Sequence, residues 1–278
     1  MSDDQAPLRR NVLALGLMTL SYGAFQGICQ TIVPLAMDHQ QFTKTTIGLV
    51  MAVPGIIAIG LGAPLARLAN GRWRRATLTF CFATAGAASV LYSNASHPLQ
   101  YVAPQLLFGL SSTAFWSNMV ASSLRLAQAS HKTHRIQAIV TSMQGVGTFG
   151  GPLAGGYLSD HSFAYGFFAG VLCAAIGLGA SRLLSPSVAI EPSVGVRSFF
   201  IGAYAQLFRL ITRQRIVTLS MSFVGLNCFL LYVMGGSFFV LYSSQIGLSV
   251  FVTAALVSGR DGISAVMRLG FGRISRHV

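Results

Sequence analysis

Charged side chains are scarce in this chain: they make up 9% of its residues, whereas 53% of the residues are hydrophobic. Soluble domains carry about 25% charged residues, so the sequence has too few polar side chains to cover a globule in water. The deficit falls mainly on acids, because 6 Asp and Glu stand against 19 Lys and Arg. The composition therefore predicts an integral membrane protein whose main partner is the lipid bilayer.

The basic excess gives a net charge of +13, a value that also occurs in nucleic-acid-binding proteins. Here, however, the basic residues form no patch interleaved with aromatic residues. They cluster in polar connections between apolar runs, which is typical of the cytoplasmic loops of membrane proteins. We therefore expect no nucleic-acid partner.

The sequence also lacks the motifs of metal sites and enzymes. The close pair His131 and His134 has no acidic or cysteine neighbour, and no H-E-x-x-H motif, phosphate loop or Ser/His/Asp set is present. We expect no metal, no cofactor and no enzymatic activity. The cysteines lie singly inside apolar runs, without metal-ligand spacing: Cys29, Cys81, Cys173 and Cys228.

Long apolar runs dominate what is present. A bilayer core about 30 Å thick requires roughly 20 apolar residues in a helix, and the first run is too long for a secretion signal. The sequence thus predicts an all-α, multi-pass membrane protein with eight spans. They are expected at 12–36, 47–67, 76–93, 101–124, 137–158, 163–184, 217–242 and 252–272.

Basic residues lie on alternate connections. Those that follow even-numbered spans, together with both termini, hold nearly all of the Lys and Arg, whereas the other connections hold only Lys44. Cytoplasmic loops carry this excess, so both termini are expected in the cytoplasm and the protein in the cell (inner) membrane. The longest connection, 185–216, leaves two alternatives open: an interfacial helix over FFIGAYAQLFRLITRQR or an ordinary solvated loop.

The stretch GTFGGPLAGG at 147–156 places small residues within an expected span. Gly147, Gly151 and Gly155 recur every four residues, which forms a flat ridge that a neighbouring backbone can approach closely. Pro152 frees a backbone carbonyl and introduces a bend, which membrane helices tolerate when neighbours satisfy that group. Gly156 follows Gly155 directly and adds a further small residue to the stretch. Close packing is the structural interpretation, and a role of the bend in gating is a further hypothesis.

Two connections share a second pattern. Residues 66–75, ARLANGRWRR, contain Arg67, Asn70, Arg74 and Arg75, and residues 272–277, GRISRH, begin with Gly272 and Arg273. The first resembles the loop signature G-x-L-A-D-R-x-G-R-R of the major facilitator superfamily of secondary transporters, with Asn70 where the family has aspartate. Residues 272–277 resemble the second copy of this loop signature, which the family is expected to carry after the eighth span. In the same family the fifth span carries G-x-x-x-G-P-x-x-G-G, an antiporter signature often seen in drug exporters, and 147–156 satisfies every fixed position.

This resemblance implies a fold with internally duplicated six-helix bundles. It predicts an N-terminal six-helix bundle at 1–184, a cytoplasmic linker at 185–216 and the first two helices of a C-terminal bundle at 217–278. Four more spans would follow in the family, so the chain is expected to be a truncated product or a fragment. The implied function is transport of a small solute by alternating access, with proton-coupled efflux as a candidate form.

Polar residues inside the expected spans are candidates for the solute path. Tyr22, Gln26 and Gln30 follow i, i+4, i+8 spacing on one helix face, and such groups must face protein or water instead of lipid. Substrate contact and helix-to-helix hydrogen bonding are equally open. Further candidates in other spans are Gln105, Ser112, Trp116, Asn227 and Tyr232. Gln105 stands four residues before Gly109, where the family often carries an arginine implicated in proton coupling.

Arg260 and Asp261 lie near the middle of the eighth expected span. A charge at that depth costs roughly 2.5 to 3.5 kcal/mol on insertion scales, so a function is expected, and Asp261 is the carboxylate placed deepest in a span. Because adjacent helix positions point about 100° apart, we expect the two side chains not to face each other directly. A structural ion pair near a water-filled cavity is the alternative.

Two other classes of function remain as alternatives to transport. A six-helix unit could serve as a platform for a membrane sensor or scaffold that transports nothing. A truncated chain could also be a non-functional product.

Overall fold

The computed structural model describes residues 5–70, 73–130, 133–184, 196–228 and 237–274. Within them every regular element is a helix, as the sequence predicts for an all-α membrane protein. The helices are α1 (Gln5–His39), α2 (Lys44–Asn70), α3 (Arg74–Ser93), α4 (Pro98–Ser130), α5 (Thr133–Ser159), α6 (Phe163–Leu183), α7 (Val196–Arg213), α8 (Arg215–Cys228), α9 (Phe239–Gln245) and α10 (Val250–Ile274).

Helices occupy each of the expected spans. The first six spans coincide with α1 to α6 and the eighth with α10, within a few residues. The seventh, expected as a single helix over 217–242, is described as α8 and α9 on either side of residues 229–236, which lie outside the described part of the chain. The connection 185–216 contains the 18-residue helix α7, so its second half is helical and not an ordinary loop.

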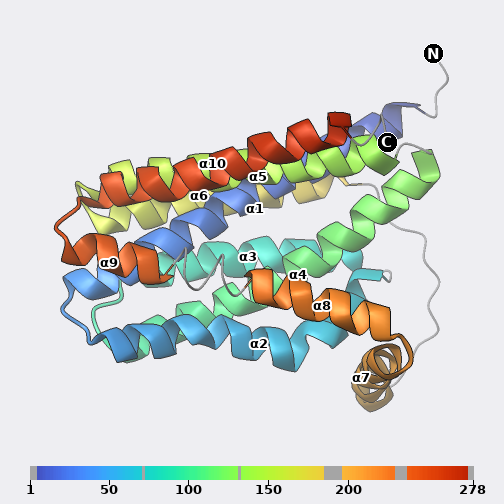
Figure 1. Ribbon diagram of the computed structural model, residues 1–278, viewed down its shortest axis with the longest axis horizontal. Helices are drawn as coiled ribbons and strands as arrows, with labels where there is room; N and C mark the ends of the chain where they lie inside the picture. The colour runs from blue at the N-terminus through green and yellow to red at the C-terminus, as the bar shows by residue number, and fades with distance from the viewer. Residues whose placement is uncertain (1–4, 71–72, 131–132, 185–195, 229–236, 275–278) are drawn as a thin grey trace.

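Long helices lie side by side and are joined by short turns (Figure 1). The centre is α1, which packs against α5, α6 and α4, while α3 packs against α4 and α6. Two helices flank this group: α2 rests on α4, and α10 rests on α5. Because α1 touches most of the bundle, its residues form much of the buried core.

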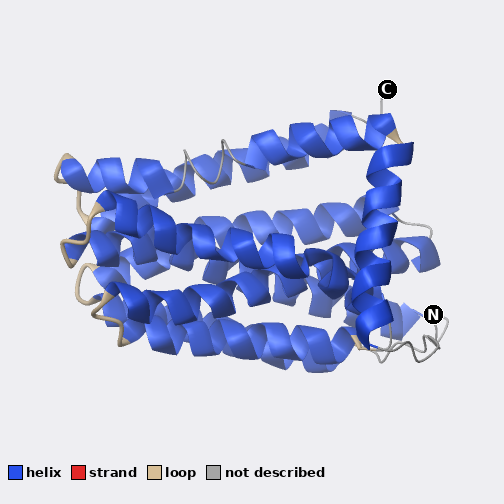
Figure 2. Cartoon of the chain, turned by 90° about the horizontal axis from the view of Figure 1, so that it is seen from below, coloured by secondary structure: helices blue, strands red, loops and turns tan. Residues whose placement is uncertain are grey.

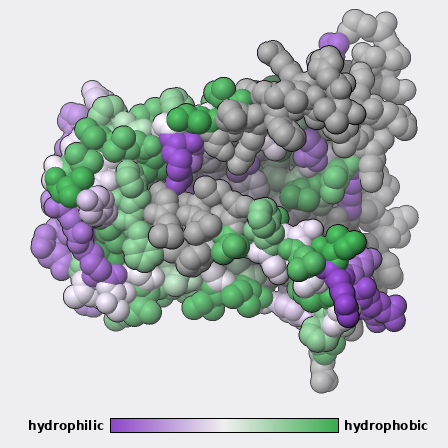
Figure 3. All heavy atoms as spheres, in the orientation of Figure 1, coloured by the Kyte–Doolittle hydropathy of each residue, from purple (hydrophilic) through white to green (hydrophobic). Residues whose placement is uncertain are grey.

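Four helices in the described residues are long and apolar enough to cross a membrane: segments Leu8–His39, Lys44–Leu68, Arg74–Ser93 and Phe163–Leu183. The second segment is only 11% buried, and it exposes Leu49, Ile56 and Ile59 at 69%, 68% and 81%. Such a helix is favourable only where its surroundings are apolar as well. Hydrophobic residues cover much of the flank in Figure 3, and hydrophilic residues gather mostly at the two ends.

The two ends of the bundle differ in charge. The end where α2, α4 and α6 terminate carries Arg67, Arg75, Arg125 and Arg182, and we call it the basic end. The opposite end carries the short connections 40–43, 94–97, 160–162 and 246–249. The helix α7 crosses the basic end: it is seen end-on in Figure 1 and runs across the long helices in Figure 2.

Candidate functional site

The glycine ridge of α5 faces α1. A Cβ atom added to Gly147 would lie 2.2 Å from the carbonyl oxygen of Leu20, and one added to Gly151 would lie 2.3 Å from that of Ala24. The approach is reciprocal, because a Cβ on Gly27 of α1 would lie 2.7 Å from Cδ of Pro152. The two backbones are therefore in direct contact, and no larger side chain fits between them without a shift.

A different face of α5 receives α10. A Cβ on Gly156 would lie 2.4 Å from Cβ of Ala254, and one on Gly262 would lie 2.7 Å from a ring carbon of Phe149. Gly155 remains on the α1 side, where a Cβ would come 3.0 Å from Ile28. The signature stretch thus holds α5 between α1 and α10, so that α5 joins the first six helices to the helices that follow the linker.

Tyr22 belongs to an aromatic cluster between α1, α3 and α4. Its ring stacks on Phe115 with centroids 3.9 Å apart and meets the edges of Phe82 at 6.1 Å and Trp116 at 6.3 Å. Tyr22 is fully buried, whereas Trp116 and Ser112 are half-buried. Of the predicted path residues on α1 and α4, the structure places Ser112 and Trp116 beside Tyr22, and it gives Tyr22 a packing role.

The glutamines of α1 and α4 are buried with unused hydrogen-bonding capacity. Gln26 is 6% exposed and Gln105 is 1% exposed, and neither Oε1 atom has a hydrogen-bond donor among the described residues. Gln105 points toward α2, because its Nε2 donates to Sδ of Met51 at 3.1 Å. Gln30 is half-buried. Buried polar atoms normally find a partner in protein or water, so these oxygens are unsatisfied in this conformation of the described residues.

Arg260 and Asp261 pair with each other, contrary to the sequence prediction. Nε of Arg260 donates to Oδ1 of Asp261 at 2.9 Å, and Nη2 lies 2.8 Å from the same oxygen. The prediction was wrong because it considered only the angle between adjacent Cα–Cβ bonds, whereas the long arginine side chain can curl back. Their side chains are 34% and 25% exposed, so the pair is partly accessible.

The loop-signature residues lie at the basic end. Nη2 of Arg75 donates to the carbonyl oxygen of Arg182 at 3.2 Å, which ties α3 to α6. Arg67 and Arg74 are half-buried. Asn70, Asn227, Gly272 and Arg273 fall within helices. The side chains of Asn70, Asn227 and Arg273 lie outside the described part of the chain, as does all of Tyr232.

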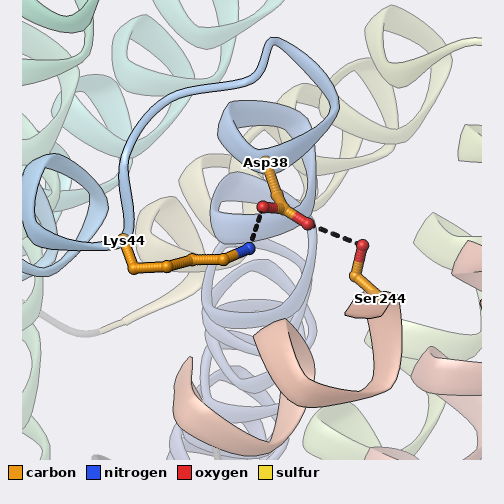
Figure 4. A network of polar contacts seen from close by, with 3 residues as sticks. All are labelled: Asp38, Lys44 and Ser244. Carbon is orange, nitrogen blue, oxygen red and sulfur yellow. Dashed lines mark hydrogen bonds and ion pairs between the residues drawn. The ribbon is translucent and has the colours of Figure 1, made fainter. Parts of the chain in front are cut away.

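The opposite end carries a network that sequence reasoning missed. Asp38 in α1 is paired with Lys44 of α2, and Oγ of Ser244 in α9 donates to Oδ2 of Asp38 at 2.6 Å (Figure 4). Nearby, the backbone N–H of Phe251 in α10 donates to Oδ1 of Asp160 at 3.2 Å. Asp38 lies in α1 and Asp160 in the turn after α5, and each accepts a hydrogen bond from a helix that follows the linker. Nothing in the sequence signals these partners, which are separated by up to 206 positions.

Beside the network of Asp38, Lys44 and Ser244, a cavity of about 780 Å³ opens between α2 and α9. Most of its lining is apolar, and its polar residues include Lys44, Thr45, Ser237 and Gln245. The described residues contain no cluster of three or more His, Cys, Asp or Glu that could hold a metal ion.

Comparison with known proteins gives one family. A family model described as Major Facilitator Superfamily matches residues 15–278. A search of the curated proteins gives no match. The matched region covers almost the whole chain, including the α5 signature and both halves that flank the linker.

Proposed function

The chain belongs to the major facilitator superfamily of secondary transporters, and on this premise we propose that it moves a small solute across the cell (inner) membrane by alternating access. The family consists of transporters, not enzymes, and the protein is an integral multi-pass membrane protein. The family match over residues 15–278 is the observation that carries the proposal. The proposal also covers the orientation of the protein in the membrane, the path of the solute and the coupling of transport to protons.

We place the basic end in the cytoplasm, because Lys and Arg concentrate in cytoplasmic loops. The opposite end then faces outward, and the contacts Asp38–Ser244 and Asp160–Phe251 would close it. These contacts at the outward end support an inward-facing state. Alternating access then requires that these contacts break while α9 and α10 move relative to α1 and α5.

The proposed solute path lies along α1 and α4. The free Oε1 atom of Gln26, the half-buried Gln30 and Ser112, and the half-buried ring of Trp116 support it. Acceptor oxygens and an aromatic surface suit an uncharged or weakly basic solute that carries hydrogen-bond donors. Asn227 and Tyr232 stay candidates from the seventh span, and Tyr22 would act by holding the Trp116 ring in place.

We propose that Asp261 carries the coupling proton and that the transport direction is export. The support for coupling is the partly exposed ion pair with Arg260 in the middle of α10, since ionisable groups at that depth are costly and usually functional. The family's arginine position in the fourth span is Gln105 here and cannot titrate. The antiporter signature of α5 supports solute/proton antiport.

The test uses Asp261→Asn in proteoliposomes. The variant should lose solute movement driven by a pH gradient but keep exchange of solute for solute, because exchange needs no net proton transfer. Glu191→Gln, which removes a carboxylate from the linker, is the matched control and should keep both activities. Equal pH-driven flux in Asp261→Asn and the parent protein would refute the coupling role.

The cargo is found by thermal shift of the purified protein over a broad solute panel, followed by flux of each hit. A hit should be transported, and Gln26→Ala should weaken its binding by about tenfold if a hydrogen bond to the buried amide is lost. A protein that binds solutes but moves none in sealed vesicles would favour the sensor function instead.

A further inference from the structure

The helix α7 is strongly amphipathic and largely uncovered. One side carries Ile201, Tyr204, Leu207, Phe208 and Ile211, which line a shallow apolar groove and which we call the α7 apolar face. Ile201 and Phe208 are 59% and 70% exposed. A face of this kind is unfavourable in water.

The other side of α7 carries the positive charge. Helical spacing places Arg209 and Arg213 together with Gln206, away from the apolar face, and all three are exposed. No Asp or Glu occurs between residues 192 and 260. The charge of this side therefore has no acidic counterpart in its own segment, so it is complementary to an anionic surface.

Contacts with α2 fix the rotation of α7. The Tyr204 hydroxyl donates to the carbonyl oxygens of Ile59 at 3.1 Å and Gly60 at 2.5 Å. The Gly60 carbonyl is open to such a bond because Pro64, four residues later, has no N–H. On the other side of α7, a Cβ on Gly202 would lie 2.8 Å from Nη1 of Arg67.

These two contacts give α7 a direction relative to the bundle. Ile59 lies eight residues before Arg67 in α2, which is about 12 Å at 1.5 Å per residue, and it lies on the side of the bundle interior. Tyr204 belongs to the apolar face, so that face points along α2 toward the interior of the membrane. The helix itself crosses the long helices (Figures 1 and 2).

We propose that α7 lies in the headgroup layer at the basic end and binds anionic phospholipids. The α7 apolar face enters the acyl chains, while Arg209 and Arg213 contact lipid phosphates. Basic residues near an anionic leaflet attract it by Coulomb forces within a Debye length, and amphipathic helices with such faces lie in the interface. The proposal holds for any membrane function and does not depend on transport.

The position of the apolar face is tested with a tryptophan reporter. F208W, on the apolar face, is compared with Q206W on the polar side, both in the full chain in phosphatidylcholine/phosphatidylglycerol vesicles. Lipids brominated near the headgroup end of the acyl chain should quench the F208W reporter strongly and the Q206W reporter weakly, after subtraction of the signal of Trp73 and Trp116. Absence of quenching in F208W with every lipid would mean that protein covers this face, and would overturn the proposal.

Charge recognition is tested with the F208W variant as well. In equal mixtures of the two lipids, brominated phosphatidylglycerol should quench the F208W reporter more than brominated phosphatidylcholine does. Each arginine in contact should raise the local preference for phosphatidylglycerol roughly fivefold. Adding R209Q/R213Q should bring the ratio to about one, whereas R9Q/R182Q, which removes the same charge elsewhere, should keep it. A ratio of about one in F208W alone would contradict binding of anionic lipid, and unchanged thermal unfolding shows that the variants are folded.

Discussion

At the scale of single residues, the described acids all have partners. Asp38 holds Lys44 and Ser244, Asp160 accepts from the backbone of Phe251, and Asp261 pairs with Arg260. In a chain with 6 acidic residues among 278, these three carboxylates all interact with helices that follow the linker. Two of them accept hydrogen bonds from α9 and α10 at the opposite end, and the third lies in the middle of α10.

Ser244→Ala should loosen the opposite end. Hydrogen bonds to charged groups contribute about 1.5–3 kcal/mol, but Asp38 is partly exposed, so we expect the lower part of that range. The reporter is Ser243→Cys, since Ser243 is buried at 1% exposure. Adding Ser244→Ala should speed its labelling about tenfold. Ser220→Ala, at an exposed position of α8, is the control and should leave the rate unchanged.

At the scale of elements, α5 has a face packed against α1 and an open face, and the two differ in the side-chain size that they tolerate. The ridge of Gly147 and Gly151 touches the backbone of α1, whereas Gly150 has no atom within 4 Å of an added Cβ. Neighbouring glycines in one helix are therefore under different constraints. Gly151 is required for the close approach of α1, whereas Gly150 has room for a side chain.

Gly151→Ala should destabilise the protein, because its Cβ would meet the Ala24 carbonyl at 2.3 Å. Overpacking of this kind costs about 1–3 kcal/mol. Gly150→Ala should be neutral or slightly stabilising, since alanine is a better helix former than glycine. Thermal unfolding in detergent compares the two. Equal melting temperatures would contradict the α1–α5 contact.

At the scale of the whole molecule, the charge of the two ends determines the orientation that we propose. The basic end carries the arginines of α2, α3, α4 and α6, and α7 crosses it. The opposite end has Lys44 and two carboxylates that hold α9 and α10. The first six helices are joined to α10 mainly through α5, so a change of conformation would act at that boundary.

Orientation is tested by labelling whole cells with a thiol reagent that does not cross membranes. Ser96→Cys lies in an exposed connection at the opposite end and should be labelled, whereas Gln206→Cys on the polar side of α7 should react only after the cells are opened. The parent protein, in which Cys29 and Cys81 are buried and Cys173 is half-buried, gives the background. Labelling of Gln206→Cys in intact cells would reverse the proposed topology.

The sequence by itself determined the helices, the family and the glycine ridge. Apolar runs of membrane length must be helical because lipid offers the backbone no hydrogen bonds, and the i, i+4 spacing of Gly147, Gly151 and Gly155 fixes one face of one helix. Both predictions need only neighbours within a segment, and the all-helical fold and the family are confirmed.

Tertiary structure decided which faces meet. Helical spacing relates Tyr22 to Gln26 but does not say that Tyr22 turns into an aromatic cluster. It also does not reveal that Arg260 curls onto Asp261. Nor can it join Asp38 to Ser244, or Tyr204 to the carbonyl that Pro64 leaves free in α2. These contacts depend on how each helix is rotated against its neighbours, and that rotation is set by the packing of the whole bundle.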